Sequence, residues 1–200
     1  MNIRIAALAL LLGAQAGFAQ DYQTAKAKAA ERTAMLDTLQ RGKEMKGSNG
    51  RYQLLTQVRA VALSNDSETP QQALSRIGEG GAQVVETKGR LVLFRSAQVQ
   101  PAVVRNAGGA SVYPTALSAR NATLGVLTGT LVVRPKNMAD ADAIATSHGL
   151  QKSKTYPQLQ TVFYEVKPGT DIADASAALQ ADPRVELAYP EIIEHVRVAK

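Results

Sequence analysis

The sequence predicts an α+β fold in which residues 129–191 form the most regular part. Three observations support this prediction. Apolar residues alternate between strand and helix spacing, Gly and Pro separate the periodic runs, and the runs follow the order strand, helix, strand, strand, helix, strand. That order suits a ferredoxin-like (βαββαβ) domain. Because this fold hosts many functions, the order alone assigns none.

The first two elements of this domain have clear ends. Residues 130–134 are a β-branched run that Pro135 stops. Residues 139–148 have helical spacing and end at Gly149, a residue suited to a left-handed helix cap. The spacing predicts the remaining elements as strands 150–156 and 161–166 around a turn at Pro157, helix 171–180 broken by Asp182-Pro183, and strand 185–189.

A smaller α+β region is expected at residues 51–128, after a flexible or helical leader at 20–50. Residues 43–50 are expected to be a flexible link. The predicted elements of the region are strand 52–63, helix 69–77, a hairpin of 82–86 and 90–95, a loop at 98–115 and strand 117–126. Both halves use a strand-helix-strand-strand order, so a duplicated module is possible, although the residues themselves show no repeat.

The N-terminus, residues 1–19, has the pattern of a secretory signal peptide. Arg4 precedes an apolar core at residues 5–12, and Gly17-Phe-Ala19 favours cleavage after Ala19. The apolar run is much shorter than the roughly 20 residues of a membrane-spanning helix. We therefore expect a periplasmic or secreted protein with no membrane segment after cleavage.

Composition limits the other partners. The formal net charge is +6, and the chain has no Cys, which excludes disulfides and Cys-based metal sites. Aromatic residues are few, and the basic residues are dispersed rather than clustered. Because nucleic-acid binding usually combines basic clusters with aromatic stacking, we expect no nucleic-acid partner. The basic surface is instead suited to solvent or to an acidic protein.

The sequence offers no catalytic constellation. His148 lies at the end of a predicted helix, and His195 lies in the C-terminal tail, so the two make no metal-ligand spacing. Serines lack a Gly-x-Ser-x-Gly context, and no Gly-rich phosphate loop precedes a helix. We therefore predict a protein that is not an enzyme and has no catalytic residues, no metal and no cofactor.

The segment Asp171-Ile-Ala-Asp-Ala-Ser-Ala-Ala-Leu-Gln-Ala-Asp-Pro-Arg-Val-Glu-Leu-Ala-Tyr-Pro-Glu191 resembles the end of the propeptides of subtilisin-like serine proteases. Those propeptides are ferredoxin-like domains that catalyse folding of the protease and then inhibit it. As a chain without a protease domain, this one is most similar to the external chaperones of the Aeromonas subtilisin-type serine protease. The resemblance implies an exported intermolecular chaperone and inhibitor with a subtilisin-like serine protease as its partner.

The resemblance also implies where the partner binds. In the family the sheet docks on two protease helices, and an acidic pair caps their N-termini. The matching positions are Tyr189 and Glu191, of which only Glu191 is acidic. The C-terminal tail, residues 192–200, would insert in an extended form into the active-site cleft, with Lys200 near the catalytic serine. Its residues are Ile192, Ile193, Glu194, His195, Val196, Arg197, Val198, Ala199 and Lys200.

Three alternatives stay open at the level of the sequence. A general periplasmic protease inhibitor would keep the fold but would not rescue a protease that misfolds alone. A small-ligand binding module of ferredoxin-like units would need a pocket with convergent polar groups. A structural envelope protein is the third alternative, and the scattered charges argue neither for it nor against it.

Overall fold

The computed structural model describes residues 26–27 and 29–195, which fall into two compact units, Met1–Leu39 and Gln40–Lys200. In the first unit, residues 29–37 are helical, as their Ala, Glu, Arg, Met and Leu content favours. The expected signal peptide, residues 1–19, lies outside the described residues. The second unit contains all the strands of the described residues.

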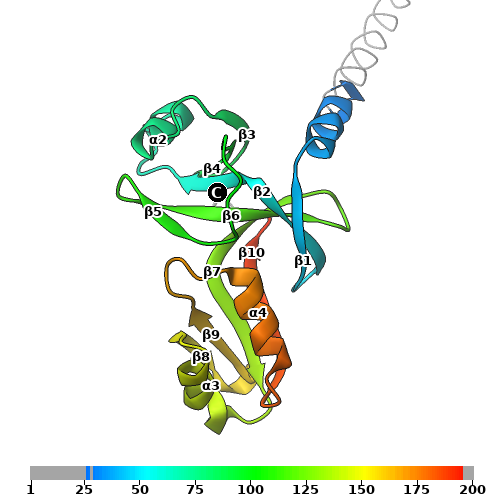
Figure 1. Cartoon of the computed structure of the whole chain (residues 1–200), viewed down its shortest axis with the longest axis vertical. Coiled ribbons are helices and arrows are strands. Elements are labelled where there is room, and N and C mark those ends of the chain that lie inside the picture. Colours follow the sequence, from blue (N-terminus) through cyan, green and yellow to red (C-terminus); the bar gives the residue numbers. More distant parts are fainter. Residues whose placement is uncertain (1–25, 28, 196–200) are drawn as a thin grey trace, which may run out of the picture. The chain divides into compact units, whose positions relative to one another are not determined.

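The first half of this unit contains one helix between strands (Figure 1). The strand, helix and hairpin expected at 52–63, 69–77 and 82–95 are confirmed within a few residues. Thr69 caps the helix in a reciprocal capping box with Gln72. The elements are β1 (Arg41–Gly47), β2 (Gly50–Ala62), α2 (Pro70–Arg76), β3 (Gln83–Lys88), β4 (Leu91–Arg95), β5 (Arg105–Ala107) and β6 (Ala110–Ser118).

Three expectations for this half are wrong. Residues 43–50 are not a flexible link, because most of them belong to the hairpin of β1 and β2. The stretch 98–115 is not all loop, since β5 and β6 pair within it. The strand expected at 117–126 is not continuous, because it contains the end of one strand at Ser118, a turn, and the start of the next strand at Leu124. The Ser118 carbonyl closes this turn by accepting from the Ala122 N–H at 3.1 Å.

The second half contains each element expected between residues 130 and 189, with longer strands at both ends. Asp171 caps the second helix, its side chain accepting from the N–H groups of Ala173 and Asp174 at 3.0 and 3.1 Å. The elements are β7 (Leu124–Pro135), η1 (Met138–Asp140), α3 (Ala141–Ser147), β8 (Gln151–Tyr156), η2 (Pro157–Leu159), β9 (Thr161–Glu165), α4 (Ile172–Ala181) and β10 (Val185–Ile193).

The described strands form one antiparallel sheet with the order β3-β4-β2-β6-β7-β9-β8 (Figure 1). Strand β10 pairs along β7, so the neighbours in the second half are β10-β7-β9-β8. The first half repeats this arrangement as β6-β2-β4-β3. Strand β7 belongs to both halves, because residues 124–126 pair with β6 and residues 130–133 pair with β9. The protein is therefore α+β with a mostly antiparallel sheet.

The largest hydrophobic cluster lies between the second half of the sheet and its two helices. Leu131 and Val133 of β7 are fully buried there with Ile144 of α3 and Leu179 of α4. Tyr164 of β9 is also fully buried, and its hydroxyl donates to the Ala141 carbonyl at 2.8 Å. Burial raises the pKa of this tyrosine to about 12. One face of this part of the sheet is thus covered by helices.

The Asp-Pro break after α4 is held by a dense set of charged contacts. The Asp182 side chain is 6% exposed, and its carboxylate accepts from Arg184 Nη2 at 2.6 Å and Nε at 3.0 Å. It also pairs with His148 Nε2 at 2.9 Å, which joins the end of α3 to the end of α4. The Arg184 guanidinium and then His148 lower the pKa of Asp182 well below its usual value.

Replacing this carboxylate should destabilise the protein in a pH-dependent way. We expect Asp182→Asn to lower the free energy of unfolding by about 1.5–3 kcal/mol at pH 7, since hydrogen bonds to a charged group are lost. A depressed carboxyl pKa stabilises the fold above the unfolded-state value of about 4, and the contribution declines as the pH falls below it. Urea denaturation should therefore show a smaller difference at pH 2.5. The exposed Asp66→Asn is the control, and an equal loss at both pH values would contradict this assignment.

Candidate functional site

The second half of the sheet has a second face that carries neither α3 nor α4. Side chains alternate between faces along a strand, so Val132, between the helix-facing Leu131 and Val133, belongs to this second face. Its cross-strand neighbours are Phe163 of β9 and Tyr189 of β10. We call it the open sheet face, defined by Thr130, Val132, Arg134, Lys154, Tyr156, Thr161, Phe163, Glu165, Leu187 and Tyr189.

The centre of the open sheet face is apolar. Leu187 and Tyr156 remain 39% and 44% exposed, which is high for large hydrophobic side chains. The Tyr156 and Phe163 rings pack edge to face with centroids 5.6 Å apart. At the margin, Arg134 and Glu186 form an exposed ion pair at 3.6 Å. An apolar centre with a charged margin is typical of a protein interaction surface.

The predicted helix-capping positions lie on β10, at the edge of this face. Tyr189 is half-buried opposite Val132. The Glu191 carboxylate accepts from the Thr128 hydroxyl at 2.8 Å. Thr128 in turn accepts from the N–H of Thr130 at 3.2 Å, so Glu191 is oriented by this segment of β7. The structure brings Tyr189 and Glu191 onto one strand, and the Glu191 carboxylate has one fixed partner.

The first residues of the predicted tail are part of the fold. Ile192 and Ile193 continue β10 and pair with Leu127 and Val126 of β7. Glu194 is half-buried, and its side chain and its main-chain carbonyl both have partners in the first half of the unit. His195 is exposed. The other tail residues, Val196, Arg197, Val198, Ala199 and Lys200, lie outside the described residues.

The partners of Glu194 are functional candidates that the sequence reasoning missed. Tyr52 donates its hydroxyl to Glu194 Oε1 at 2.8 Å, and Lys88 donates to the Glu194 carbonyl at 2.9 Å. Tyr52 lies 142 positions and Lys88 lies 106 positions from Glu194 in the sequence. Because neither local spacing nor composition reports contacts at such separations, no signal in one sequence could have found them.

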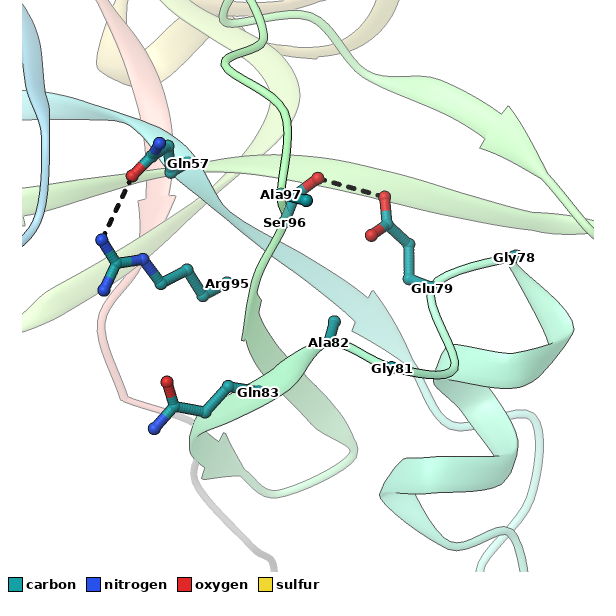
Figure 2. A pocket seen from close by; sticks show the side chains of 9 residues that line it. All are labelled: Gln57, Gly78, Glu79, Gly81, Ala82, Gln83, Arg95, Ser96 and Ala97. Carbon is teal, nitrogen blue, oxygen red and sulfur yellow. Dashed lines mark hydrogen bonds between the residues drawn. The ribbon is translucent and has the colours of Figure 1, made fainter.

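A hollow of about 530 Å³ lies in the first half of the unit, beside α2, β3 and β4 (Figure 2). Two pairs of its polar side chains point toward each other, Gln57 with Arg95 and Ser96 with Glu79, while Gln83 stands apart from both pairs (Figure 2). Ser96 donates to Glu79 at 3.2 Å, Arg105 pairs with Glu79 at 3.2 Å, and Arg95 donates to Gln57 at 3.4 Å. Because these groups pair with each other, the hollow does not favour the small-ligand binding alternative.

Two further findings concern only the described part of the chain. Residues 26–27 and 29–195 contain no group of three or more His, Asp or Glu side chains placed to hold a metal ion. Within the same ranges, no helix combines the length and the hydropathy that crossing a membrane would require.

Comparison with known proteins gives one family and one solved structure. The family model described as "Open reading frame 2 N-terminal domain" matches residues 25–197. The structure is the "Crystal structure of aeromonas sobria serine protease (ASP) and the chaperone (ORF2) complex", at 23% identity and a TM-score of 0.36. The match covers 48% of this chain and 99% of that chain. Nothing about fold or function follows from a structural match at this score. No curated protein matches.

Proposed function

The chain belongs to the open reading frame 2 N-terminal domain family, and from that premise we propose that it is an exported chaperone and inhibitor of a subtilisin-like serine protease. The second half of the second unit acts as a ferredoxin-like propeptide module. The strand order β10-β7-β9-β8, with α3 and α4 on one face, supports this assignment. The protein acts by binding and not by catalysis, and it needs no metal or cofactor.

The open sheet face is the observation that carries the proposal. A propeptide-like module docks by the sheet face that its helices leave uncovered, and this face presents Tyr156, Phe163 and Leu187 to a partner. Two parallel helices of the protease pack there. Glu191 lies on β10 at the rim and caps one helix N-terminus, a contact of about 0.3–1 kcal/mol. Such a contact orients docking, whereas apolar burial supplies most of the affinity.

The tail supplies inhibition. After β10 the chain continues into the active-site cleft, where an extended segment adds a strand to the cleft edges. Backbone hydrogen bonds give affinity, and Lys200 at the first specificity position suits a protease that cuts after basic residues. A chaperone bound to the folded protease also stabilises it by mass action. Export by the signal at residues 1–19 places the protein in the periplasm or the medium with its partner.

Co-expression tests this proposal. The subtilisin-like protease encoded nearest to this chain is expressed without a propeptide, alone and with the full chain or a chain ending at His195. This truncation removes the part of the tail that follows β10 and keeps Glu194, which contacts the fold. The full chain should yield folded protease in an inhibited complex, and the truncated chain should yield folded protease with much weaker inhibition.

Two results would contradict the proposal. Active protease in the absence of the chain would show that no chaperone is needed, and would favour a general protease inhibitor. Equal inhibition by the full and truncated chains would show that the tail does not occupy the cleft.

A further inference from the structure

Residues Ile192–Glu194, at the end of β10 and just after it, contact side chains from the first half of the unit. We call these three residues the tail base. Pairing of Ile192 with Leu127 and of Ile193 with Val126 fixes their backbone against β7. The register of β10 shifts between Pro190 and Ile192, so the tail base is a separate paired segment beyond the propeptide-like strand.

The Ile192 side chain enters a slot that two glycines leave open. A Cβ atom at Gly47 would meet the Tyr52 ring at 2.5 Å and Ile192 Cδ1 at 3.0 Å, and a Cβ at Gly125 would overlap Ile192 Cγ2. Gly47 ends β1, and Gly125 lies in the segment of β7 that pairs with β6. Both positions therefore need glycine for close approach, and together they fix where Ile192 packs.

Tyr52 holds the Glu194 side chain. The tyrosine is 1% exposed within the main hydrophobic cluster, and its hydroxyl donates to Glu194 Oε1 at 2.8 Å. Burial and the neighbouring Glu194 carboxylate raise the pKa of Tyr52 to about 12, so the hydroxyl remains a donor across the physiological range. A rigid aromatic side chain with a buried ring fixes its hydroxyl with little loss of rotamer entropy.

Lys88 holds the Glu194 main chain. Its side chain is 9% exposed, and the ammonium donates to the Glu194 carbonyl at 2.9 Å and lies 3.5 Å from Glu86 Oε1. A lysine this deeply buried needs partners for its charge, and the tail-base carbonyl is one of them. Because this contact is with the backbone, it fixes the direction of the chain and not only a side chain.

We propose that the first half of the unit is a clamp, formed by Tyr52, Lys88 and the slot between Gly47 and Gly125, that fixes the register and direction in which the tail leaves the sheet. The clamp itself consists of contacts within this chain. Its use in presenting the tail to a protease cleft rests on the proposed function. A pre-organised tail loses less conformational entropy on insertion, so the clamp strengthens inhibition without touching the protease.

Hydrogen exchange of the full chain tests the clamp without any partner. Tyr52→Phe removes one oxygen, and Lys88→Met removes the ammonium while keeping the stem. Both variants should speed amide exchange of residues 192–195 by about tenfold, because each loses a hydrogen bond to a charged or main-chain group. Tyr113→Phe and Lys136→Met, whose side chains form no hydrogen bond or ion pair with the tail base, are the matched controls. Exchange at wild-type rates in both variants would overturn the clamp.

Inhibition separates this inference from the proposed function. With the protease of the co-expression experiment, Tyr52→Phe should inhibit about tenfold more weakly than Tyr113→Phe, while both support folding of the protease. Faster exchange with unchanged inhibition would overturn the positioning role. Failure of the wild-type chain to fold or inhibit the protease would contradict the proposed function, and the exchange result would still decide whether the clamp exists.

Discussion

Leu187→Glu is expected to weaken binding of the proposed partner, a subtilisin-like protease, by about 100-fold, or roughly 2.7 kcal/mol. Leu187 is 39% exposed on the open sheet face, so a carboxylate there is hydrated in the free chain and the fold is retained. In the complex the same carboxylate would be buried against an apolar partner surface without a compensating hydrogen bond. Titration of the protease, inactivated at its catalytic serine, by calorimetry measures the change.

A charge placed elsewhere on the surface is the matched control. Val99 is 59% exposed in the segment between β4 and β5, away from the open sheet face. Val99→Glu should bind as the wild type does. If Leu187→Glu binds equally well while its melting temperature is unchanged, the protease docks on another surface and the docking part of the proposed function is wrong.

Arg59→Met is expected to cost the largest amount of folding stability, about 3–5 kcal/mol. Arg59 is 1% exposed, and its guanidinium donates to four backbone carbonyls. Nη1 reaches Leu55 at 3.0 Å and Val58 at 2.9 Å, and Nη2 reaches Gln100 at 2.6 Å and Pro101 at 2.9 Å. Methionine fills the volume but removes the guanidinium donors from all four carbonyls. Val58 and Pro101 keep one other donor each, the Thr115 hydroxyl at 3.0 Å and the Val103 N–H at 2.9 Å.

The reason for a buried arginine lies in the irregular backbone around it. The pairing of β2 with β6 is interrupted between Leu55 and Arg59, so carbonyls there lack ladder partners. Burial lowers the pKa of Arg59 to about 10, with a further effect of Arg105, and the group stays charged at neutral pH. The planar guanidinium of Arg59 therefore bonds both to the interrupted part of β2 and to the segment that leads to Ala102. The Ala102 carbonyl in turn accepts from the Ile172 N–H, the first of α4, at 3.0 Å.

Guanidinium denaturation of Arg59→Met, Arg59→Lys and Arg120→Met measures this contribution. The lysine variant keeps the charge but not the fork, so its loss should be intermediate. Arg120 is exposed, and its replacement should change the free energy of unfolding by less than about 0.5 kcal/mol. A loss below about 1 kcal/mol for Arg59→Met would mean that water replaces the guanidinium at the four carbonyls.

The sequence predicted the second half of the unit well because its signals are local. Pro135, Gly149 and the Asp171 cap mark the ends of elements, and each is confirmed within a few residues. The resemblance carried by the last of these segments is confirmed by the family match.

Alternation on β10 predicts Val185, Leu187 and Tyr189 as one inward core face, and this prediction is wrong. The register shift between Val185 and Leu187 leaves Val185 in the main cluster with Ala188 and places Leu187 and Tyr189 on the open sheet face.

The first half failed where pairing partners are distant or the composition is unusual. Met45 is the one buried residue of strand β1, and most of its neighbours are charged, so the sequence pattern is that of a polar linker. The segment is a strand because it pairs with β2. Strand β6 contains Pro114, which normally argues against a strand but lies here opposite the interruption at Arg59. The contacts of Glu194 depend on the same long-range pairing.

Strand β7 has a consequence for how the protein unfolds. It pairs with β6 at its start, with β9 at its end and with β10 along its length. No linker therefore separates the two halves, and loss of β7 removes a central strand of the second half and a partner of β6 in the first half. The second unit is in this sense one cooperative structure. We therefore expect heat to unfold it in one transition, in which the tail base is released together with both halves.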